Sequence, residues 1–486
     1  LGGSGILDPM SDTRPNVLFL MSDEHRADVT GYEGNTVVRT PTLDWLAETG
    51  VRFANCYAAS PICVPGRQSM MAGQLPRTTG VQRYGEDLPP FSMTFARRLA
   101  QFAYQTTCCG KLHHDGPDQM QGWTRRVAGD TGVTARHIEG KDEAAYAALE
   151  AAEQGCGKWS DAKECIRAGY MPERGEQDKT RAALGLFNAK YLASRYDRPN
   201  PHQPALFKVS YTRPHYPYFT TQDKFEYYLN RVEPYFVDDV FDHPFLGMRR
   251  VRPGVDASRR EIRRATAAYY GMIEEIDEDY GSIIERLRYV GQDPDDWIII
   301  YCSDHGEMLG EHGIWEKQKF FEASARVPLI IRPRKCDREA WGCEGNVVTE
   351  NVNLCDLFAT LCELCAVPLP DVEQTVHGAG LDSRSLVPLI RGEAGDWHER
   401  YHNETISQFG GTNLMIKRDA LKYQRYDRED CADQPEVLFD LEADPGETRN
   451  LIDEPAYRDR VEQFRRRCAE LAFGPDADTN YRNAGY

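Results

Sequence analysis

The sequence lacks any long apolar run. No uninterrupted hydrophobic stretch in its 486 residues approaches the roughly 18 residues that a membrane-spanning helix needs. We therefore expect no transmembrane segment and no membrane partner. The first apolar stretch, within "SDTRPNVLFLMSDEHR", is also too short and too acidic at its flanks for a secretory signal. These absences favour a cytoplasmic protein, with residues 1–9 as a cloning scar ahead of Met10.

An excess of positive charge is absent as well. The chain has 58 Lys and Arg against 76 Asp and Glu, which gives a formal net charge of -18. Binding to nucleic acid or to an anionic membrane surface needs basic patches, so this balance argues against both partners. If the substrate is an anion, the positive charge that binds it must be gathered locally, against the field of the whole protein.

Cysteine, by contrast, is plentiful, with 14 residues. In a long chain without a secretory signal we expect free thiols rather than a disulfide framework. Cys362 and Cys365 have the C-x-x-C spacing of some zinc sites. They follow a helical stripe of apolar residues, however, and this stripe predicts that both thiols lie in the core. The stripe consists of Leu354, Leu357, Phe358 and Leu361.

Apolar segments typical of buried strands alternate with segments typical of helices. This alternation predicts βαβ units and an α/β fold with a large, mostly parallel sheet sandwiched by helices. Beyond residue 375, short strands joined by tight turns predict a smaller α+β domain with an antiparallel sheet. We place the main domain at 10–375 and the C-terminal subdomain at 376–486. The expected strands with their polar exits are 15–23, 104–114, 205–218, 297–307 and 326–333, and the expected helices are 40–50, 259–289 and 456–472.

Polar side chains gather just after the predicted strands. In open α/β sheets, ligands bind in the crevice outside the carboxyl ends of the strands. Segments that are far apart in the sequence are therefore expected to form one site. The residues concerned are Asp23 and Glu24, Lys111 and His113, His215, and Asp304 with His305.

Two of these segments, "MSDEHR" and "YCSDHGE", suit a divalent cation. Asp23 and Asp304 each follow an apolar strand, and His305 adjoins Asp304, while Glu24 adjoins Asp23. A ligand set made mainly of oxygen atoms points to Ca²⁺, Mg²⁺ or Mn²⁺. Either segment alone is more typical of solvated turn carboxylates and helix caps, but the two together favour a metal site.

The stretch "SPICVPGRQSMMAG", residues 60–73, is the part of the chain that core packing explains least. Arg67 follows Cys63 too soon for the C-x5-R loop of thiol phosphatases, and no local signature of a Cys-His protease is present. A buried structural thiol is the simple alternative. Pro65 suits the first turn of a helix and Gly66 frees the backbone there, so Arg67 would point back toward Cys63.

The motif C-x-P-x-R at Cys63 resembles the modification site of the type I, formylglycine-dependent sulfatases of the alkaline-phosphatase superfamily. In that family the cysteine is oxidised to formylglycine, whose hydrate offers two hydroxyls to the reaction. The resemblance extends over nearly the whole chain and is strongest to the choline-sulfatase-like branch. The resembling segments, in order, are "PNVLFLMSDEHR", "TPTLDWLAETGVRFANCYAASPICVPGRQSMMAGQLPRTTG", "GKLHHDGPDQ", "TRPHYPY", "SDHGEMLGEHGIWEKQKFFEASARVPLII" and "LFDLEADPGETRNL".

The resemblance implies an alkaline-phosphatase-like fold and the hydrolysis of small-molecule sulfate monoesters to an alcohol and inorganic sulfate. One hydroxyl of the formylglycine at Cys63 would ligate a divalent cation, with Ca²⁺ expected and Mn²⁺ as the alternative. Arg67 would hold that hydroxyl and offset its charge. The implied protein ligands are Asp23, Asp304 and His305, together with Glu24, which stands where the family often has Asp or Gln.

The resemblance also assigns the remaining site residues. Lys111 and Lys317 would clamp the sulfate oxygens, and His215 would protonate the leaving alcohol. His113 would take the proton of the second hydroxyl, so that sulfate leaves and the aldehyde returns. His114 is the alternative to His113, but the spacing G-K-x-H favours His113. Fixed cations and a metal-activated nucleophile suit a sulfate ester, because negative oxygens shield its sulfur from attack.

Two other functions stay open. A phosphonate monoester or phosphodiester hydrolase of the same superfamily also uses formylglycine and an Asp-Asp-His metal set. Those enzymes resemble this chain less at residues 111–113, where they have Tyr and Thr in place of the K-x-H residues. A non-catalytic metal-binding protein, with Cys63 left as a thiol, fits less well because all the supporting polar positions are filled.

The sequence leaves the organic group of the substrate open among choline, aryl and other alkyl sulfates. Choline needs an aromatic cage, yet "RRVAGDTGVTARHIEG" stands where the choline branch has a D-F-G-W-like segment. Tyr84 stands at a slot where that branch has an Asn near the sulfate. The expected partners are the sulfate ester and a formylglycine-generating enzyme, and the tyrosine-rich end "DADTNYRNAGY" suggests an arm for a homo-oligomer.

Overall fold

The structure is a computed structural model of the chain. It describes residues 14–114, 116–129, 166–193, 200–235, 259–426 and 436–471. The predicted cloning scar at 1–9 and the tyrosine-rich C-terminal end lie outside these described residues.

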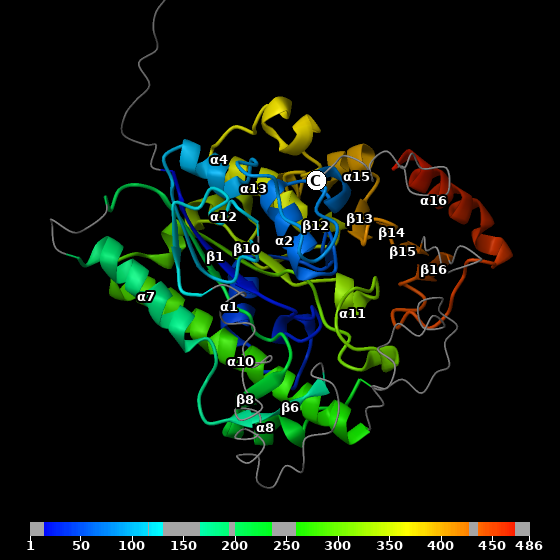
Figure 1. Cartoon of the computed structure of the whole chain (residues 1–486), viewed down its shortest axis with the longest axis horizontal. Coiled ribbons are helices and arrows are strands. Elements are labelled where there is room, and N and C mark those ends of the chain that lie inside the picture. The colour runs from blue at the N-terminus through cyan, green and yellow to red at the C-terminus, as the bar shows by residue number, and fades with distance from the viewer. Residues whose placement is uncertain are drawn as a thin grey trace, which may run out of the picture.

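An eight-stranded sheet forms the centre of the molecule (Figure 1). Its strands lie in the order β11-β2-β10-β9-β1-β7-β4-β5. The run from β9 to β5 pairs in parallel, whereas β10 is antiparallel to both of its neighbours. A mostly parallel sheet confirms the predicted α/β class. The strands are β1 Asn16–Ser22, β2 Val51–Phe53, β4 Gln105–Gly110, β5 Arg125–Val127, β7 Ala205–Ser210, β9 Trp297–Ser303, β10 Leu329–Arg332 and β11 Asn346–Val348.

The central strand β1 is buried on both faces, because helices cover the sheet on each side. Val17, Phe19 and Met21 point to one face and Leu18 and Leu20 to the other, as the alternation of side chains along a strand requires. The first face packs against α2, α4 and α13, and the second packs against α1, α7 and α10 (Figure 1). These helices are α1 Pro41–Thr49, α2 Cys63–Ala72, α4 Phe95–Gln101, α7 Gln177–Tyr191, α10 Arg259–Tyr289 and α13 Leu357–Leu364.

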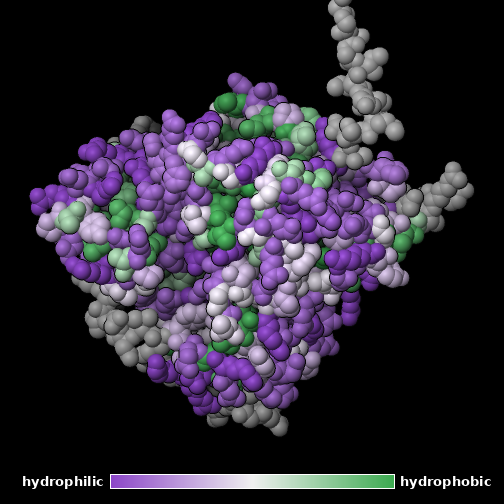
Figure 2. Space-filling view, turned by 180° about the vertical axis from the view of Figure 1, so that it is seen from behind, coloured by the Kyte–Doolittle hydropathy of each residue, from purple (hydrophilic) through white to green (hydrophobic). Residues whose placement is uncertain are grey.

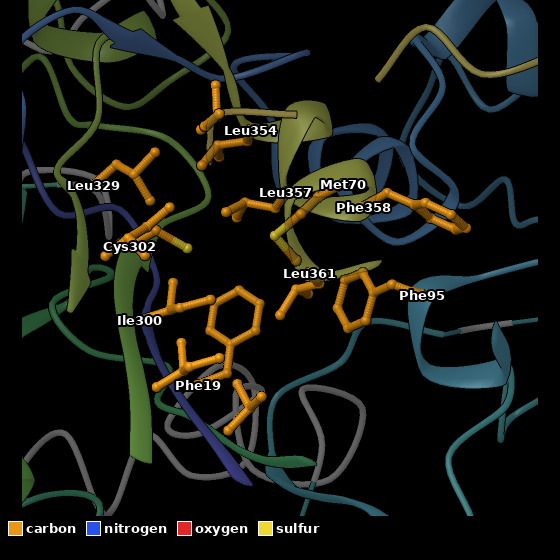
Figure 3. Packing of buried hydrophobic residues seen from close by; sticks show 14 of the residues in the cluster. Phe19, Met70, Phe95, Ile300, Cys302, Leu329, Leu354, Leu357, Phe358 and Leu361 are labelled. Carbon is orange, nitrogen blue, oxygen red and sulfur yellow. The ribbon is translucent and has the colours of Figure 1, made fainter. Parts of the chain in front are cut away.

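The core between β1 and the first set of helices is tightly filled. Figure 3 shows Phe19 of β1 and Ile300 of β9 facing Phe95 of α4 and Leu361 of α13. The rings of Phe19 and Phe95 lie with their centroids 6.0 Å apart. Cys362 and Cys365 are buried free thiols in the same cluster, as the apolar stripe predicts.

A second, two-stranded parallel sheet packs on the long helix α10. It joins β6 Ala168–Met171 to β8 Tyr218–Thr221, and α8 Gln222–Leu229 follows β8 directly. The rings of Tyr218 and Tyr269 meet edge to face, with their centroids 5.7 Å apart. This sheet is not predicted from the sequence. It fixes the far end of the loop that leaves β7 and carries His215.

A four-stranded antiparallel sheet, in the order β13-β14-β15-β16, forms the C-terminal part of the described chain. Helix α16 Arg458–Glu470 covers it on one side, where the rings of Tyr423 and Phe464 stack with centroids 5.3 Å apart. Elsewhere buried Lys422 forms ion pairs with Glu322 and Glu447. The sheet confirms the predicted architecture, while the boundary at 376 stays a prediction. The strands are β13 Glu404–Phe409, β14 Asn413–Arg418, β15 Leu421–Tyr426 and β16 Glu436–Asp440.

Shorter elements connect these parts. Within the described ranges, no helix combines the length and the apolar character that a bilayer crossing needs. On the face shown in Figure 2, hydrophobic residues form separate patches within a largely hydrophilic surface. The remaining strands and α-helices are β3 Cys56–Tyr57, β12 Val352–Asn353, α3 Pro76–Thr79, α11 Glu322–Ala325, α12 Lys335–Trp341, α14 Val387–Ile390 and α15 Ala394–Tyr401.

The packing around β1 leads to a stability prediction. Replacing Phe19 by Ala should lower the free energy of unfolding by about 3–5 kcal/mol, because the cavity forms in a fully buried core. Urea unfolding followed by tryptophan fluorescence measures this change. Leu369→Ala serves as the control: Leu369 is half-exposed, so its loss should cost at most about 0.5 kcal/mol. Equal losses for the two variants would contradict this view of the core.

Candidate active site

The carboxyl ends of four neighbouring strands meet at one edge of the central sheet. Asp23 follows β1, Lys111 follows β4, and Asp304 follows β9, while Ser210 ends β7. The first turn of α2 faces the same edge and brings Cys63 there. Because parallel strands end on the same side of a sheet, side chains from five distant segments share one buried space.

Cys63 is the first residue of α2. Ile62 before it is extended, and all ten residues of the helix are buried. Pro65 costs no hydrogen bond in this first turn, because the first N–H groups of a helix have no partner within it. The Cys63 Sγ lies 3.1 Å from His305 Nε2 and 3.6 Å from Lys111 Nζ. Position 63 is therefore surrounded by groups that favour a negative charge.

The pKa of the Cys63 thiol reflects these neighbours. Burial raises the pKa, but the positive charges of Lys111, His305 and Lys317 outweigh burial and hold it well below its usual range. For His305, burial lowers the pKa, but Asp304 and Cys63 raise it to about 9. The cations around position 63 thus favour a negative charge there, as a metal-bound oxygen would need.

Arg67, one turn into α2, binds both strand-end aspartates. Its Nε donates to Asp304 Oδ2 at 2.6 Å, and its Nη2 donates to Asp23 Oδ2 at 3.1 Å. Its Nη1 donates to the Lys111 carbonyl and to Ser210 Oγ, each at 3.0 Å. This side chain is fully buried. From the sequence, Arg67 is predicted only to hold the hydroxyl at position 63; its contacts with the two carboxylates are seen in the structure alone.

Four side chains form a set that can hold a metal ion. The ligand atoms of Asp23, Cys63, Asp304 and His305 all lie within 4.8 Å of one another. His305 Nδ1 lies 2.9 Å from the Gly306 carbonyl, which leaves Nε2 facing the set. Arg67 takes the Oδ2 atoms of both aspartates. Asp23 Oδ1 lies 3.8 Å from Cys63 Sγ, whereas Asp304 Oδ1, 3.8 Å from His305 Nε2, also accepts from the backbone N–H groups of Glu24 and His305.

The charges of the two aspartates suit a cation. Burial raises the pKa of each carboxyl, but the positive charge of Arg67 acts on both and that of Lys111 adds to it, so both pKa values are lowered. Both groups are therefore carboxylates, which are the hard oxygen donors that Ca²⁺, Mg²⁺ and Mn²⁺ prefer. The residues present fit the metal that the sequence predicts.

Glu24 joins the metal set to a second group of cations. Its Oε2 lies 3.2 Å from Lys317 Nζ and 3.4 Å from His215 Nε2. Its Oε1 is buried, and burial raises the pKa of the Glu24 carboxyl well above its usual range, with the nearby Glu307 carboxyl adding to this and the Lys317 ammonium opposing it. Ligand atoms of Asp23, Glu24 and His215 also lie within 4.8 Å of one another. Whether Glu24 ligates the metal stays a prediction.

His215 and Lys317 come from different loops and lie side by side. His215 Nε2 is 2.7 Å from Lys317 Nζ, while His215 Nδ1 is 2.7 Å from the Tyr216 carbonyl. The Lys317 ammonium sits over the Tyr216 ring, 4.4 Å from its centroid. The contact of Nδ1 with the backbone directs Nε2 toward Lys317 and Glu24.

The two adjacent histidines after β4 turn to different neighbours. His113 Nε2 is 3.1 Å from the Tyr84 hydroxyl, and His114 Nδ1 is 3.2 Å from Gln68 Nε2. Gln68 lies on α2 and also donates to the His113 carbonyl. His113 has a positive φ of 63°. In the sequence, Tyr84 stands out only as a departure from the choline branch, and its contact with His113 is not predicted.

Comparisons with known proteins fit this geometry. A family model described as Sulfatase matches residues 15–367, and one described as N-sulphoglucosamine sulphohydrolase, C-terminal, matches residues 310–473. A choline-sulfatase of Rhizobium meliloti is 30% identical over 92% of this chain and 84% of its own. An arylsulfatase of Clostridium perfringens is 27% identical over 93% of each chain.

Solved structures share the fold. A phosphonate monoester hydrolase of Agrobacterium radiobacter superposes with a TM-score of 0.74 at 23% identity, over 94% of this chain and 95% of that one. A 2-O GAG sulfatase, BT1596, superposes with a TM-score of 0.68 at 19% identity, over 97% and 96% of the two chains. At such identities these neighbours support the architecture alone.

The contacts of Arg67 lead to a prediction on metal-free protein. Arg67→Gln should lower the free energy of unfolding by about 3–5 kcal/mol, because it leaves two buried carboxylates without their shared partner. Thermal or urea unfolding in the presence of a chelator measures the loss. Arg465→Gln, which breaks the exposed pair with Glu436, should cost about 1 kcal/mol or less. A similar small loss for Arg67→Gln would show that the aspartates do not depend on it.

Proposed function

The chain belongs to the sulfatase family and is a sulfuric ester hydrolase, and from that premise we propose that it hydrolyses small-molecule sulfate monoesters by means of a formylglycine made from Cys63. One observation carries the proposal: Cys63 Sγ lies 3.1 Å from His305 Nε2, inside the set of metal ligands and 3.6 Å from the Lys111 ammonium. A side chain at this place can reach a cation and a bound sulfate at once.

The proposed metal site uses groups that the fold has already oriented. Asp23, Asp304, His305 and an oxygen at position 63 would hold one divalent cation, with Ca²⁺ as the first choice and Mn²⁺ as the alternative. When bound, such a cation offsets negative charge and lowers the pKa of an oxygen bound to it. Glu24 is proposed as a further ligand through its buried Oε1.

The cysteine itself cannot supply the chemistry that we propose. A hydrated aldehyde at position 63 offers two hydroxyls, of which one attacks sulfur and the other later lets sulfate leave, whereas a thiol has neither. A formylglycine-generating enzyme is therefore a required partner. Because Cys63 and the whole of α2 are buried, we propose that this partner acts on the chain before it folds.

In the first half of the reaction, Lys111 and Lys317 would hold the sulfate oxygens and offset the charge that develops on them. In this step His215 would carry a proton on both ring nitrogens: Nδ1–H stays on the Tyr216 carbonyl, and Nε2, which lies 3.4 Å from Glu24 Oε2, gives its proton to the alcohol oxygen as the S–O bond to that oxygen breaks. Its place supports this role, since Nε2 also lies 2.7 Å from Lys317 Nζ and thus beside the proposed sulfate site. A positioned acid typically adds about 10²- to 10⁴-fold in rate.

In the second half, His113 would take a proton from the remaining hydroxyl, so that the bond to sulfate breaks and the carbonyl returns. His113 follows Lys111 by two residues at the end of β4, and Lys111 Nζ lies 3.6 Å from Cys63 Sγ. The same segment thus supplies one group for sulfate binding and one for sulfate release. Addition of water to the carbonyl would restore the starting state.

Two alternatives remain, and the site weighs against each. A phosphonate monoester or phosphodiester hydrolase would use the same metal set, but the Lys111 ammonium and the His113 imidazole at its edge favour a sulfate ester. A non-catalytic metal-binding protein leaves unexplained why Lys111, Lys317 and His215 gather beside the metal set. The organic group stays open among choline, aryl and other alkyl sulfates. Cytoplasmic location and homo-oligomerisation stay predictions.

A panel of esters tests the proposal. With one aryl alcohol as the leaving group, kcat/KM should be highest for the sulfate monoester and lower for the phosphate and phosphonate esters. Cys63→Ala, which keeps the fold, should lower turnover of the sulfate ester by more than about 10³-fold. Peptide mass spectrometry should find that the peptide containing residue 63 is lighter than the cysteine form, by the mass of H₂S lost minus the mass of O gained. If kcat/KM were highest for the phosphonate ester, the result would instead favour a phosphonate monoester hydrolase.

Metal removal gives a second prediction. A chelator should reduce hydrolysis of the aryl sulfate, and Ca²⁺ or Mn²⁺ should restore it, because the cation is the largest local positive charge at the sulfur. Binding of Ca²⁺ measured by calorimetry should weaken strongly in Asp304→Asn. Asp293→Asn, which lies before β9 at the opposite end of the sheet, serves as the control. Full activity after complete metal removal would exclude the proposed role.

A further inference from the structure

His113 needs a fixed ring if it is to work as a base. It is buried, and its backbone has a positive φ, so its placement depends on the side chains around it. An imidazole can accept a proton only at a nitrogen that carries no hydrogen, and the partner of the other nitrogen decides which one that is. The question is therefore which group holds the other nitrogen.

Tyr84 contacts His113 directly. Its hydroxyl lies 3.1 Å from His113 Nε2, and the two rings meet at 82° with their centroids 5.1 Å apart. Tyr84 is 61% exposed, whereas His113 is 3% exposed. The tyrosine thus covers the histidine at the protein surface. A tyrosine hydroxyl carries one proton and lone pairs that accept, so its oxygen can accept the Nε2 proton of an imidazole.

The loop that carries Tyr84 is held in place by two carboxylates. Glu86 accepts hydrogen bonds from the backbone N–H groups of Gln82 at 2.6 Å and Arg83 at 2.9 Å. Asp87 accepts from the Gly116 backbone N–H and from Gln121 Nε2. Since Gly116 follows His113 by three residues, Asp87 ties the Tyr84 loop to the segment that carries His113. The pair is therefore held by the fold and does not depend on substrate.

We propose that Tyr84 is a positioning residue for His113: its hydroxyl oxygen accepts the Nε2 proton, fixes the ring and leaves Nδ1 as the basic nitrogen. This inference rests on the proposed function, because it deepens the role assigned there to His113. It also gives a physical reason for tyrosine at position 84, since phenylalanine would fill the same space without holding Nε2. The proton that the mechanism removes would arrive at Nδ1.

The first test reads the tautomer without any turnover. In protein labelled with ¹⁵N-histidine, the His113 ring, identified by its loss in His113→Ala, should show protonated Nε2 and unprotonated Nδ1 near neutral pH. In Tyr84→Phe both nitrogens should shift toward averaged values as the preference is lost. Protonated Nδ1 in the wild-type protein, or identical spectra in the two proteins, would overturn the proposal. Because no substrate is used, this result does not depend on whether the proposed function holds.

The second test separates the two half-reactions. The test requires that the wild-type enzyme hydrolyses an aryl sulfate. In that case Tyr84→Phe should lower kcat by about 10- to 100-fold, as loss of a group that orients a site residue typically does. It should leave kcat/KM unchanged, because kcat/KM reports the steps up to alcohol release. A burst of alcohol followed by slow sulfate release should appear. In the His113→Ala background, Tyr84→Phe should have no further effect, because Tyr84 acts only through His113.

Two variants serve as controls. Tyr289→Phe, at the remote end of α10 and 70% exposed, should leave all constants unchanged. Tyr84→Ala removes the ring as well as the hydroxyl. If Tyr84→Phe behaves like the wild type and only Tyr84→Ala lowers kcat/KM, the ring binds the leaving group and the positioning role is wrong. If Tyr84→Phe lowered kcat further in the His113→Ala background, the positioning role would be contradicted as well. Absence of sulfatase activity in the wild-type enzyme would instead contradict the proposed function.

Discussion

One buried guanidinium organises the whole site. Arg67 donates to Asp23 and Asp304, to the Lys111 carbonyl and to Ser210, which are side chains or backbone from the ends of four strands. A planar fork with five donors can make these contacts at once, and a lysine could not. Because each aspartate gives one oxygen to Arg67, the guanidinium fixes both carboxylates beside position 63. These contacts explain the spacing of the motif at the start of α2. Cys63 is the first residue of the helix, and Arg67 lies one helical turn later, on the side of the aspartates.

The cations gathered at the site are opposite in sign to the net charge of the whole chain. A net charge of -18 repels an anionic substrate at long range, so the site has to supply its own positive charge. Lys111, Lys317 and His305 gather around position 63, where Lys111 also pairs with Asp23 and Lys317 with Glu24, while Arg67 is shared between the two aspartates. Burial makes this arrangement effective, because charges interact more strongly where water is excluded. The unmodified thiol responds to this field through its depressed pKa.

The sequence predicts the placement of the site better than its internal contacts. Hydropathy marks the ends of β1 and β9, so Asp23 and Asp304 could be assigned to one edge of a parallel sheet. The contacts of Arg67 and Tyr84 could not be predicted, because they depend on distances between side chains from separate loops and strands. The small sheet of β6 and β8 was missed for a different reason. Its strands are short and pack on a helix, so they lack the long apolar pattern of the central strands.

The two histidines proposed for catalysis are each accompanied by a tyrosine, and the two pairs differ in a way that matches their roles. His215 turns Nδ1 to the Tyr216 backbone and points Nε2 at Lys317, so its outward nitrogen lies beside the proposed sulfate site, where an acid must meet the leaving oxygen. His113 has the opposite arrangement, because its Nε2 contacts the Tyr84 hydroxyl and Nδ1 is the nitrogen proposed for the reaction. A backbone carbonyl can only accept, so it fixes a proton on the His215 nitrogen that faces it. A hydroxyl can donate as well as accept, so the tautomer proposed for His113 depends on the direction of one hydrogen bond, the bond with the Tyr84 hydroxyl.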